Sequence, residues 1–276
     1  MDRPLHHRAF VVSVVWTLVL LFLGSVVHAT ESSLACPDWP TCYGTMVPEM
    51  SGGVFWEHLH RLVAGGLILM WLLATYLAWG PGRDRPILRK ATVAGLVLLL
   101  VQAVLGGVTV ILRLPDAVST SHLGLAFLFL AVATVLSAIS APGWREREAG
   151  PDSGSTLTPW LAGAAALVFA QSILGAWVRH ADAGMACPDI PLCLGEWVPP
   201  LDQRLVVIHW LHRGVGVLAG LVVVGVAAAL FARVRAPRLR FGALAAGSLV
   251  LVQVGLGFLS VHTVLSVTPV SLHTLV

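Results

Sequence analysis

Four histidines of this chain occur as two pairs, and the second pair repeats the first. His60 returns as His212 at an offset of 152 residues, and His122 returns as His273 at an offset of 151. All four border or lie in apolar stretches, where ionisable side chains are costly and usually kept for function. A single histidine near a helix end is usually structural, but two repeated pairs predict two ligand sites of one design.

Two pairs of cysteines repeat in the same way. Cys36 and Cys42 return as Cys187 and Cys193, in loops of the form CxxxxxC. This short spacing favours a disulfide bond within each loop, Cys36–Cys42 and Cys187–Cys193, in an oxidising compartment. A zinc site is the alternative, although it would need cysteines from both loops and lacks the usual CxxC spacing. Exchange of electrons or thiols with a partner is a further role open to the cysteines.

Glu57 adds a candidate acid–base group to the first half alone. In a helix Glu57 and His60 share a face, whereas His58 points about 200° away from His60. The position that matches Glu57 in the second half is His209. A carboxylate in one half indicates that this half performs chemistry, although its simpler role is a favourable charge near a helix N-terminus.

An arginine follows the first histidine of each pair, as Arg61 and Arg213. A guanidinium fork suits carboxylates, so both arginines are candidate cofactor-binding residues. The alternative, which the sequence supports equally, is that they extend from the membrane interface toward water.

The elements that position these residues are transmembrane helices. Of the 276 residues, 57% are hydrophobic and 11% are charged, and the mean hydropathy is +0.85. Such values are typical of membrane proteins, and a spanning helix needs roughly 20 apolar residues. Seven such runs lie near 9–28, 57–79, 91–112, 120–140, 159–179, 206–231 and 242–262. The sequence therefore predicts an all-α integral membrane protein.

The two ends of the chain need separate interpretation. An eighth run begins near residue 270 and has only seven residues, the last of which is Val276. We expect this helix to be truncated and the sequence to be incomplete there, which would weaken the hold on His273. The first run resembles a signal peptide, but it precedes Cys36 as 159–179 precedes Cys187, so we expect it to be retained.

The distribution of basic residues predicts the orientation in the membrane. Twelve Arg and Lys residues fall on one side, and three fall in the opposite loops: Arg113, Arg179 and Arg204. The positive-inside rule places the N-terminus in the cytoplasm of a multi-pass cell-membrane protein. The cysteine loops, near 29–56 and 180–205, then lie outside. With a formal net charge of +3 and no clustered basic surface, no nucleic-acid partner is expected.

The repeat also divides the chain into domains. An N-terminal half, 1–142, and a C-terminal half, 159–276, are joined by a charged, Gly- and Ser-rich linker at 143–158. Each half is predicted to be a four-helix bundle. Because four is an even number, the tandem bundles share one orientation and are related by a pseudo-twofold axis along the membrane normal.

Within each half, the histidines are expected in the first turn or so of the second and fourth helices. Those helices run in the same direction and can present imidazoles across the bundle core, which is a recurrent cofactor site. Paired imidazoles suit axial ligation of haem iron. Gln102 and Gly106 also recur, as Gln253 and Gly257, and interhelical hydrogen bonds or cofactor contacts are the expected roles of the glutamines.

These motifs, in this order and twice over, resemble those of the haem A synthase family. The family pattern is eight membrane helices in two halves, four haem-ligand histidines, a Glu-x-x-His-Arg motif and outer loops with paired cysteines. The chain matches it from Glu57 to Arg61, at His122, at His212 and Arg213, at His273 and at both cysteine pairs. The resemblance implies an oxidoreductase that converts the C8 methyl of haem O to a formyl group by successive hydroxylations, making haem A for terminal oxidases.

The resemblance also implies a role for each site residue. His60 and His122 would hold the substrate haem as catalytic residues, with Glu57 assisting proton transfer or stabilising a cation. His212 and His273 would be axial ligands of a permanent haem B. The implied partners are haem O, haem O synthase, a terminal oxidase under assembly, an unidentified electron acceptor and membrane lipid, with a possible homo-oligomer.

Two other classes of protein use the same residues. A membrane cytochrome b that only passes electrons needs four such histidines, and a haem-delivery assembly factor would bind haem in transit. A carboxylate in one half alone, and conversion of the bound haem, would distinguish a synthase from both. A metal-dependent hydrolase is disfavoured, because the chain has no HExxH-type motif.

Overall fold

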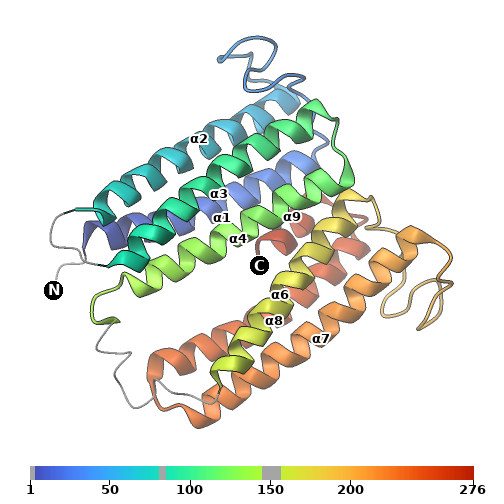
Figure 1. Ribbon diagram of the computed structural model, residues 1–276. Helices are drawn as coiled ribbons and strands as arrows, with labels where there is room; N and C mark the ends of the chain where they lie inside the picture. The colour runs from blue at the N-terminus through green and yellow to red at the C-terminus, as the bar shows by residue number, and fades with distance from the viewer. Residues whose placement is uncertain (1–3, 81–84, 145–156) are drawn as a thin grey trace. The chain divides into compact units, whose positions relative to one another are not determined.

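The computed structural model describes residues 4–80, 85–144 and 157–276, and these residues form helices and loops without a strand. The helices, coloured along the chain in Figure 1, are α1 (Leu5–Ala29), α2 (Gly52–Ala78), α3 (Pro86–Ile111), α4 (Asp116–Ile139), α6 (Thr158–His180), α7 (Arg204–Arg233), α8 (Pro237–His262) and α9 (Val267–Leu275). Most of the predicted linker, 143–158, and four of the basic residues used to predict the orientation lie outside the described residues.

Seven of these helices are long and apolar enough to cross a membrane, which confirms an all-α integral membrane protein. They match the seven predicted runs and begin one to five residues earlier. Three of them, α3, α6 and α8, start with proline in the first turn, where its missing N–H costs nothing. Large apolar side chains such as Leu69, Tyr76 and Leu221 are exposed, as contact with lipid requires.

By its contacts the chain divides into two compact units, 1–149 with Leu275 and 150–274 with Val276. Within the first unit, α1 and α3 each pack against α2 and α4, and these helices run alongside one another in Figure 1. The four helices therefore close into a bundle in which α2 and α4 are the diagonal pair. The relation of the two units by a twofold axis stays a prediction.

The core of the first unit is centred on Trp71 of α2, which is fully buried. Its ring lies 5.6 Å from that of Phe10 on α1 and 4.8 Å from that of Phe129 on α4, between centroids. Its indole N–H donates to the carbonyl oxygen of Thr92 on α3 at 2.9 Å. One side chain thus ties all four helices together, with its polar atom satisfied.

In the second unit, α7 packs against both α6 and α8. The short helix α9 is joined to α8 by a hydrogen bond from the Gln253 side chain to the carbonyl oxygen of His273 at 2.8 Å. It is also joined to α6, since Arg179 donates to the hydroxyl of Thr274 at 3.0 Å. Helix α9 begins three residues earlier than predicted, and His273 is held by these contacts.

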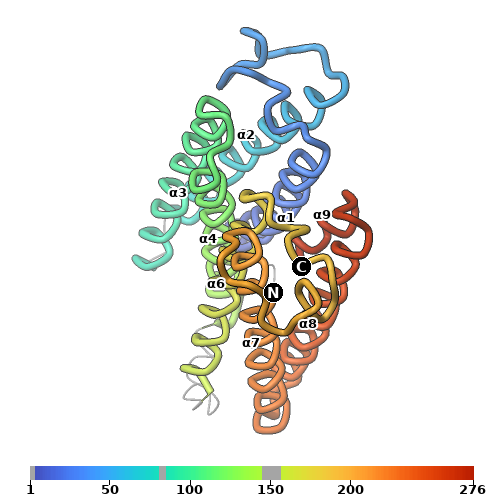
Figure 2. The backbone as a smooth tube through the Cα atoms, turned by 90° about the vertical axis from the view of Figure 1, so that its right-hand side faces the viewer, coloured from blue at the N-terminus to red at the C-terminus, as the bar shows by residue number. Residues whose placement is uncertain are grey.

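Each unit carries one long loop that joins two of its spanning helices. The loop between α1 and α2 projects beyond the helix ends in Figure 2, and the loop between α6 and α7 extends beyond the ends of its helices in Figure 1. Both contain a disulfide bond, Cys36–Cys42 and Cys187–Cys193, as predicted.

Candidate functional site

The four repeated histidines occupy matched positions in their helices. His60 stands eight positions after the start of α2 and His212 eight after the start of α7, whereas His122 and His273 each stand six positions into α4 and α9. At 1.5 Å per residue, the pairs lie about 12 Å and about 9 Å below their helix starts. The histidines are therefore two turns deep, rather than in the first turn, because the helices begin earlier than the apolar runs.

Each imidazole of the first unit lies against a glycine of a neighbouring helix. A Cβ placed on Gly24 of α1 would stand 3.0 Å from Cε1 of His60, and a Cβ on Gly106 of α3 would stand 2.9 Å from Cε1 of His122. Such distances are shorter than ordinary van der Waals contact, so only glycine leaves the ring its place.

The second unit repeats these contacts. A Cβ on Gly175 of α6 would stand 3.0 Å from Cε1 of His212, and a Cβ on Gly257 of α8 would stand 3.0 Å from Cε1 of His273. Gly24 and Gly175 were not singled out from the sequence, although their common offset of 151 residues was a signal that could have found them. Both sites are therefore built in the same way, with each histidine ring packed into the space left by a glycine.

The two imidazoles of the second unit lie edge to face, at a separation that would let both bind one metal. The ring centroids of His212 and His273 are 6.4 Å apart, with the ring planes at 89°. With a metal–nitrogen bond of about 2 Å and about 1 Å from nitrogen to ring centre, imidazoles on opposite sides of one metal have centres roughly 6 Å apart. His212 and His273 could therefore both bind the iron of a haem, whose usual ligands include histidine.

The first unit offers the same donor set. Its histidines stand on the diagonal helices α2 and α4, at the same positions in their helices as their counterparts. Nδ1 is buried in both His60 and His122, although each residue as a whole is half-buried. The accessible edge of each ring is therefore the one that carries Nε2, the nitrogen that most often binds metals. These residues also fit a haem.

The repeated glutamines hold the backbone beside the second histidine of each pair. Gln102 of α3 donates to the carbonyl oxygen of His122 at 2.7 Å, as Gln253 of α8 does to that of His273. Nδ1 of His273 donates in turn to the carbonyl oxygen of Gln253 at 3.0 Å, which leaves Nε2 unprotonated and able to bind a metal. The glutamines therefore form the interhelical hydrogen bonds that were one of their two expected roles.

Glu57 is buried and joins the first histidine helix to the cysteine loop. Its carboxylate accepts a hydrogen bond from the backbone N–H of Cys36 at 2.8 Å. It also forms an ion pair with Arg61, one turn further along α2, at 2.6 Å. The carboxylate thus has a partner for each oxygen, three residues before the candidate ligand His60.

Arg61 binds the backbone of the cysteine loop. Its guanidinium donates to the carbonyl oxygens of Asp38 at 2.8 Å, of Thr41 at 2.7 Å and of Cys36 at 3.3 Å. Neither of the two interpretations from the sequence included these contacts, because main-chain carbonyls leave no trace in a sequence pattern. Binding of cofactor carboxylates by this arginine stays a prediction.

Arg213 makes the matching contacts in the second unit. Its guanidinium donates to the carbonyl oxygens of Asp189 at 2.7 Å, of Leu192 at 2.8 Å and of Cys187 at 2.5 Å. His209 takes the place of Glu57, with Nδ1 3.3 Å from the backbone nitrogen of Cys187 and Nε2 3.1 Å from Nε of Arg213. His209, whose role the sequence did not explain, therefore anchors the cysteine loop.

The cysteines do not form a metal site. Among the described residues, one group of three has the spacing to hold a metal ion, namely Cys36, Cys42 and His58. Both of its sulfur atoms belong to the disulfide bond, and no thiol of the chain is free. The zinc alternative is therefore wrong for this structure.

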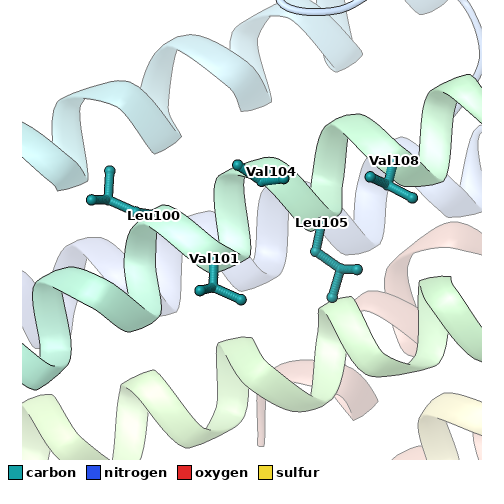
Figure 3. A pocket seen from close by; sticks show the side chains of 5 residues that line it. All are labelled: Leu100, Val101, Val104, Leu105 and Val108. Carbon is teal, nitrogen blue, oxygen red and sulfur yellow. The ribbon is translucent and has the colours of Figure 1, made fainter.

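A shallow hollow lies on the surface of α3. Its five lining side chains all come from α3 and carry no nitrogen or oxygen (Figure 3): Leu100, Val101, Val104, Leu105 and Val108. Such a surface can accept an acyl chain but cannot orient a polar ligand. The histidine pairs remain the candidate site.

Known proteins resemble this chain over most of its length. The family of cytochrome oxidase assembly proteins, COX15-CtaA, matches residues 7–53 and 49–276. The heme A synthase of Lysinibacillus sphaericus is 28% identical over 276 residues, covering 96% of this chain and 88% of the relative. That of Geobacillus kaustophilus is 28% identical over 260 residues, covering 91% and 81%, and that of Shouchella clausii is 26% identical over 217 residues, covering 78% and 72%. The repeated histidines thus stand in a chain that belongs to the cytochrome oxidase assembly protein family.

Proposed function

We propose that the protein is a haem A synthase, a multi-pass enzyme of the cell membrane that oxidises the C8 methyl group of haem O to the formyl group of haem A. The observation that carries this proposal is the pair of imidazoles at 6.4 Å in the second unit, together with a matching ligand set in the first. The names of the relatives support the choice of reaction. Conversion of the methyl to a formyl group adds one oxygen atom and removes four electrons.

The two histidine pairs have different tasks in this proposal. His60 and His122 hold the substrate haem O through its iron. His212 and His273 hold a resident haem B, which supplies one-electron transfer when bound. The glycines behind the rings leave the space that fixes the position of each imidazole before haem binds. A ligand fixed in advance places the reacting methyl group of the haem reproducibly.

Glu57 is the residue proposed to assist the chemistry in the first unit. A carboxylate can assist proton transfer during the reaction or stabilise positive charge on the reacting carbon. The ion pair with Arg61 and the hydrogen bond from Cys36 fix its position. The second unit has His209 instead and, in this proposal, only transfers electrons.

The proposed enzyme also has a defined orientation in the membrane and defined partners. The excess of basic residues on one side supports a cytoplasmic N-terminus and cysteine loops outside the membrane. Haem O synthase would supply the substrate, a terminal oxidase under assembly would take the product, and an electron acceptor would remove the electrons. Self-association is a further part of the proposal.

Haem extraction and mass analysis test the proposal directly. The native chain and Glu57→Ala are each expressed beside a source of haem O, with Ser172→Ala as a control. Haem A in the native and control proteins, and its loss in Glu57→Ala, is the expected result. Haem B alone in all three would favour an electron-transferring cytochrome b. Absence of bound haem would refute the four-ligand assignment.

A further inference from the structure

The first imidazoles of the two pairs, His60 and His212, differ at Nδ1, the nitrogen that would carry the proton if Nε2 bound a metal. In the second unit, Nδ1 of His212 lies 3.0 Å from the side-chain amide of Gln171, and Nδ1 of His273 donates to the carbonyl oxygen of Gln253. In the first unit, the ring of His122 likewise interacts with the backbone of Gln102, but Nδ1 of His60 is buried and has no hydrogen-bond partner in the part of the chain that the structure describes.

The difference at the first histidine of each pair comes from one helical position. Gln171 stands on α6, one turn before Gly175, the glycine behind His212. At the same offset of 151 residues the first unit has Leu20, one turn before Gly24. Leu20 packs against the hydrophobic core of its unit and has no polar atom to offer His60.

A second position changes together with the first. A Cβ placed on Gly216 of α7 would stand only 2.8 Å from the amide nitrogen of Gln171. The space for this amide therefore exists because residue 216 is a glycine. Gly216 follows His212 by four residues, and the residue that follows His60 by four is Ala64, which has a Cβ. The first unit thus lacks both the amide and the space for it.

A partner at Nδ1 strengthens a histidine ligand. When Nε2 binds a metal, Nδ1 carries the proton, and a hydrogen bond from it orients the ring and increases the basicity of the ligand. The carboxamide carries an acceptor as well as a donor, and a half-turn about its last bond exchanges them. Nε2 of Gln171 also donates to the carbonyl oxygen of His212 at 2.9 Å. The half-turn exchanges this bond for one from Nδ1 of His212 to Oε1 of Gln171, which is buried and has no partner among the described residues.

We propose that Gln171, in the space that Gly216 provides, is a positioning residue that makes the second unit the site of tightly held haem, whereas Leu20 and Ala64 leave the first unit with a pair that releases haem readily. A synthase needs this difference, because its substrate and product must exchange while its electron-transfer haem stays. The inference rests on the proposed function and adds the residues that distinguish the two sites.

Reciprocal exchange of these residues tests the inference. The double variant Gln171→Leu/Gly216→Ala gives the second unit the residues of the first, and Leu20→Gln/Ala64→Gly does the reverse. Each is made in a chain with one intact pair: His122→Ala leaves the second pair, and His273→Ala leaves the first. The detergent-solubilised proteins are loaded with haem B, and its transfer to excess apomyoglobin is followed by absorbance.

We expect the first exchange to speed haem loss from the second unit by about 10- to 100-fold, the usual effect of removing such an outer hydrogen bond. The reverse exchange slows loss from the first unit. Ser172→Ala, at the half-buried position beside Gln171 whose hydroxyl donates to the carbonyl oxygen of Val168 on the same helix, keeps the native rate. Equal rates for the native chain and the Gln171→Leu/Gly216→Ala variant would overturn the inference.

The reduction potential of the second haem separates a hydrogen bond at Nδ1 from a general loss of packing. Gln171→Glu keeps an acceptor and adds negative charge, so it lowers the potential, whereas Gln171→Leu raises it. A packing defect would shift both variants in the same direction and would overturn the role given to Gln171. If the variants bind haem and release it at the native rate, this inference is refuted but the proposed function is not. If neither histidine pair binds haem, the proposed function is refuted as well.

Discussion

Glu57 and His209 perform the same structural task in the two units with different chemistry. Each lies beside the backbone N–H of the first cysteine of its loop and beside the arginine four residues further along its helix. A carboxylate accepts both hydrogen bonds at once, whereas a neutral imidazole has one acceptor nitrogen and accepts only one of them. Loop anchoring therefore does not require a carboxylate. The carboxylate of Glu57 in the first unit is thus a candidate for a role in the reaction as well.

Substitution of Glu57 by glutamine separates these two roles. The amide oxygen of Glu57→Gln still accepts from Cys36, so the loop keeps its order, but the negative charge is gone. We expect haem A formation to fall by about 100-fold or more, as is usual when an acid–base group is lost. Haem A is measured by extraction, and loop order by hydrogen exchange at Cys36.

The matched variant is His209→Gln in the second unit, which should keep most of the haem A formation because no proton transfer is assigned there. Native haem A formation in Glu57→Gln would contradict the chemical role and leave Glu57 as a loop anchor alone.

Removal of the arginine side chain should loosen the cysteine loop. In Arg61→Ala the carbonyl oxygens of Cys36, Asp38 and Thr41 lose their donor, and Glu57 is left buried without its ion-pair partner. Loss of one partner of a buried pair costs about 3 kcal/mol. Limited proteolysis should therefore cut the loop faster in the variant, even with the disulfide bond intact.

Arg61→Lys is the informative comparison, because one ammonium group cannot reach three carbonyls in the fork geometry of a guanidinium. Proteolysis of Arg61→Lys at the native rate would show that the loop contacts contribute little.

The order of the first loop should depend on pH through Asp38. Its carboxylate accepts hydrogen bonds from the Thr41 hydroxyl and from the backbone N–H groups of Gly44 at 2.9 Å and Tyr43 at 2.6 Å. The Thr41 hydroxyl first, and then the N–H of Gly44, lower the pKa of Asp38 below its ordinary value of 3.8. A lowered pKa means that the ionised carboxylate stabilises the loop above this value and ceases to do so as the pH falls through the lowered one.

We expect hydrogen-exchange protection of Tyr43 and Gly44 to be constant near neutral pH and lost only below pH 3.8. In Thr41→Val the loss moves to higher pH, since the main cause of the lowered pKa is gone, and in Asp38→Asn the protection varies little with pH. A native profile for Thr41→Val would contradict the assignment.

The sequence was sufficient to predict the helices because lipid leaves little choice: apolar runs of this length must form helices that satisfy their own backbone. It was less informative about where the helices begin. Helix α2 starts at Gly52, five residues before the apolar run, since the first turns of a membrane helix lie in the interface, where polar residues are tolerated. For that reason His60 lies two turns deep.

For the site, the residues that recur in both halves could be predicted, whereas their main-chain partners and the positions that differ could not. The histidines, Gln102 and Gly106 were predictable because they recur. The partners of Arg61 were not, because they are main-chain carbonyls. Gln171 and Gly216 were missed for the opposite reason: they are positions at which the halves differ, and a search for repeated residues passes over them.

The glycine behind each histidine provides the last test, with a matched control on a neighbouring helix. In Gly24→Ala the new Cβ would stand 3.0 Å from Cε1 of His60, so the ring must move by a few tenths of an ångström. A Cβ on Gly65 of α2 meets nothing within 4 Å, and alanine there should be neutral or stabilise the helix by up to about 1 kcal/mol.

Both variants are made in the His273→Ala chain and loaded with haem B, and the bound haem is quantified. We expect about tenfold weaker binding in Gly24→Ala, with an altered electron paramagnetic resonance spectrum, and native behaviour in Gly65→Ala. Native binding and spectrum in Gly24→Ala would show that the ring does not depend on the space beside it.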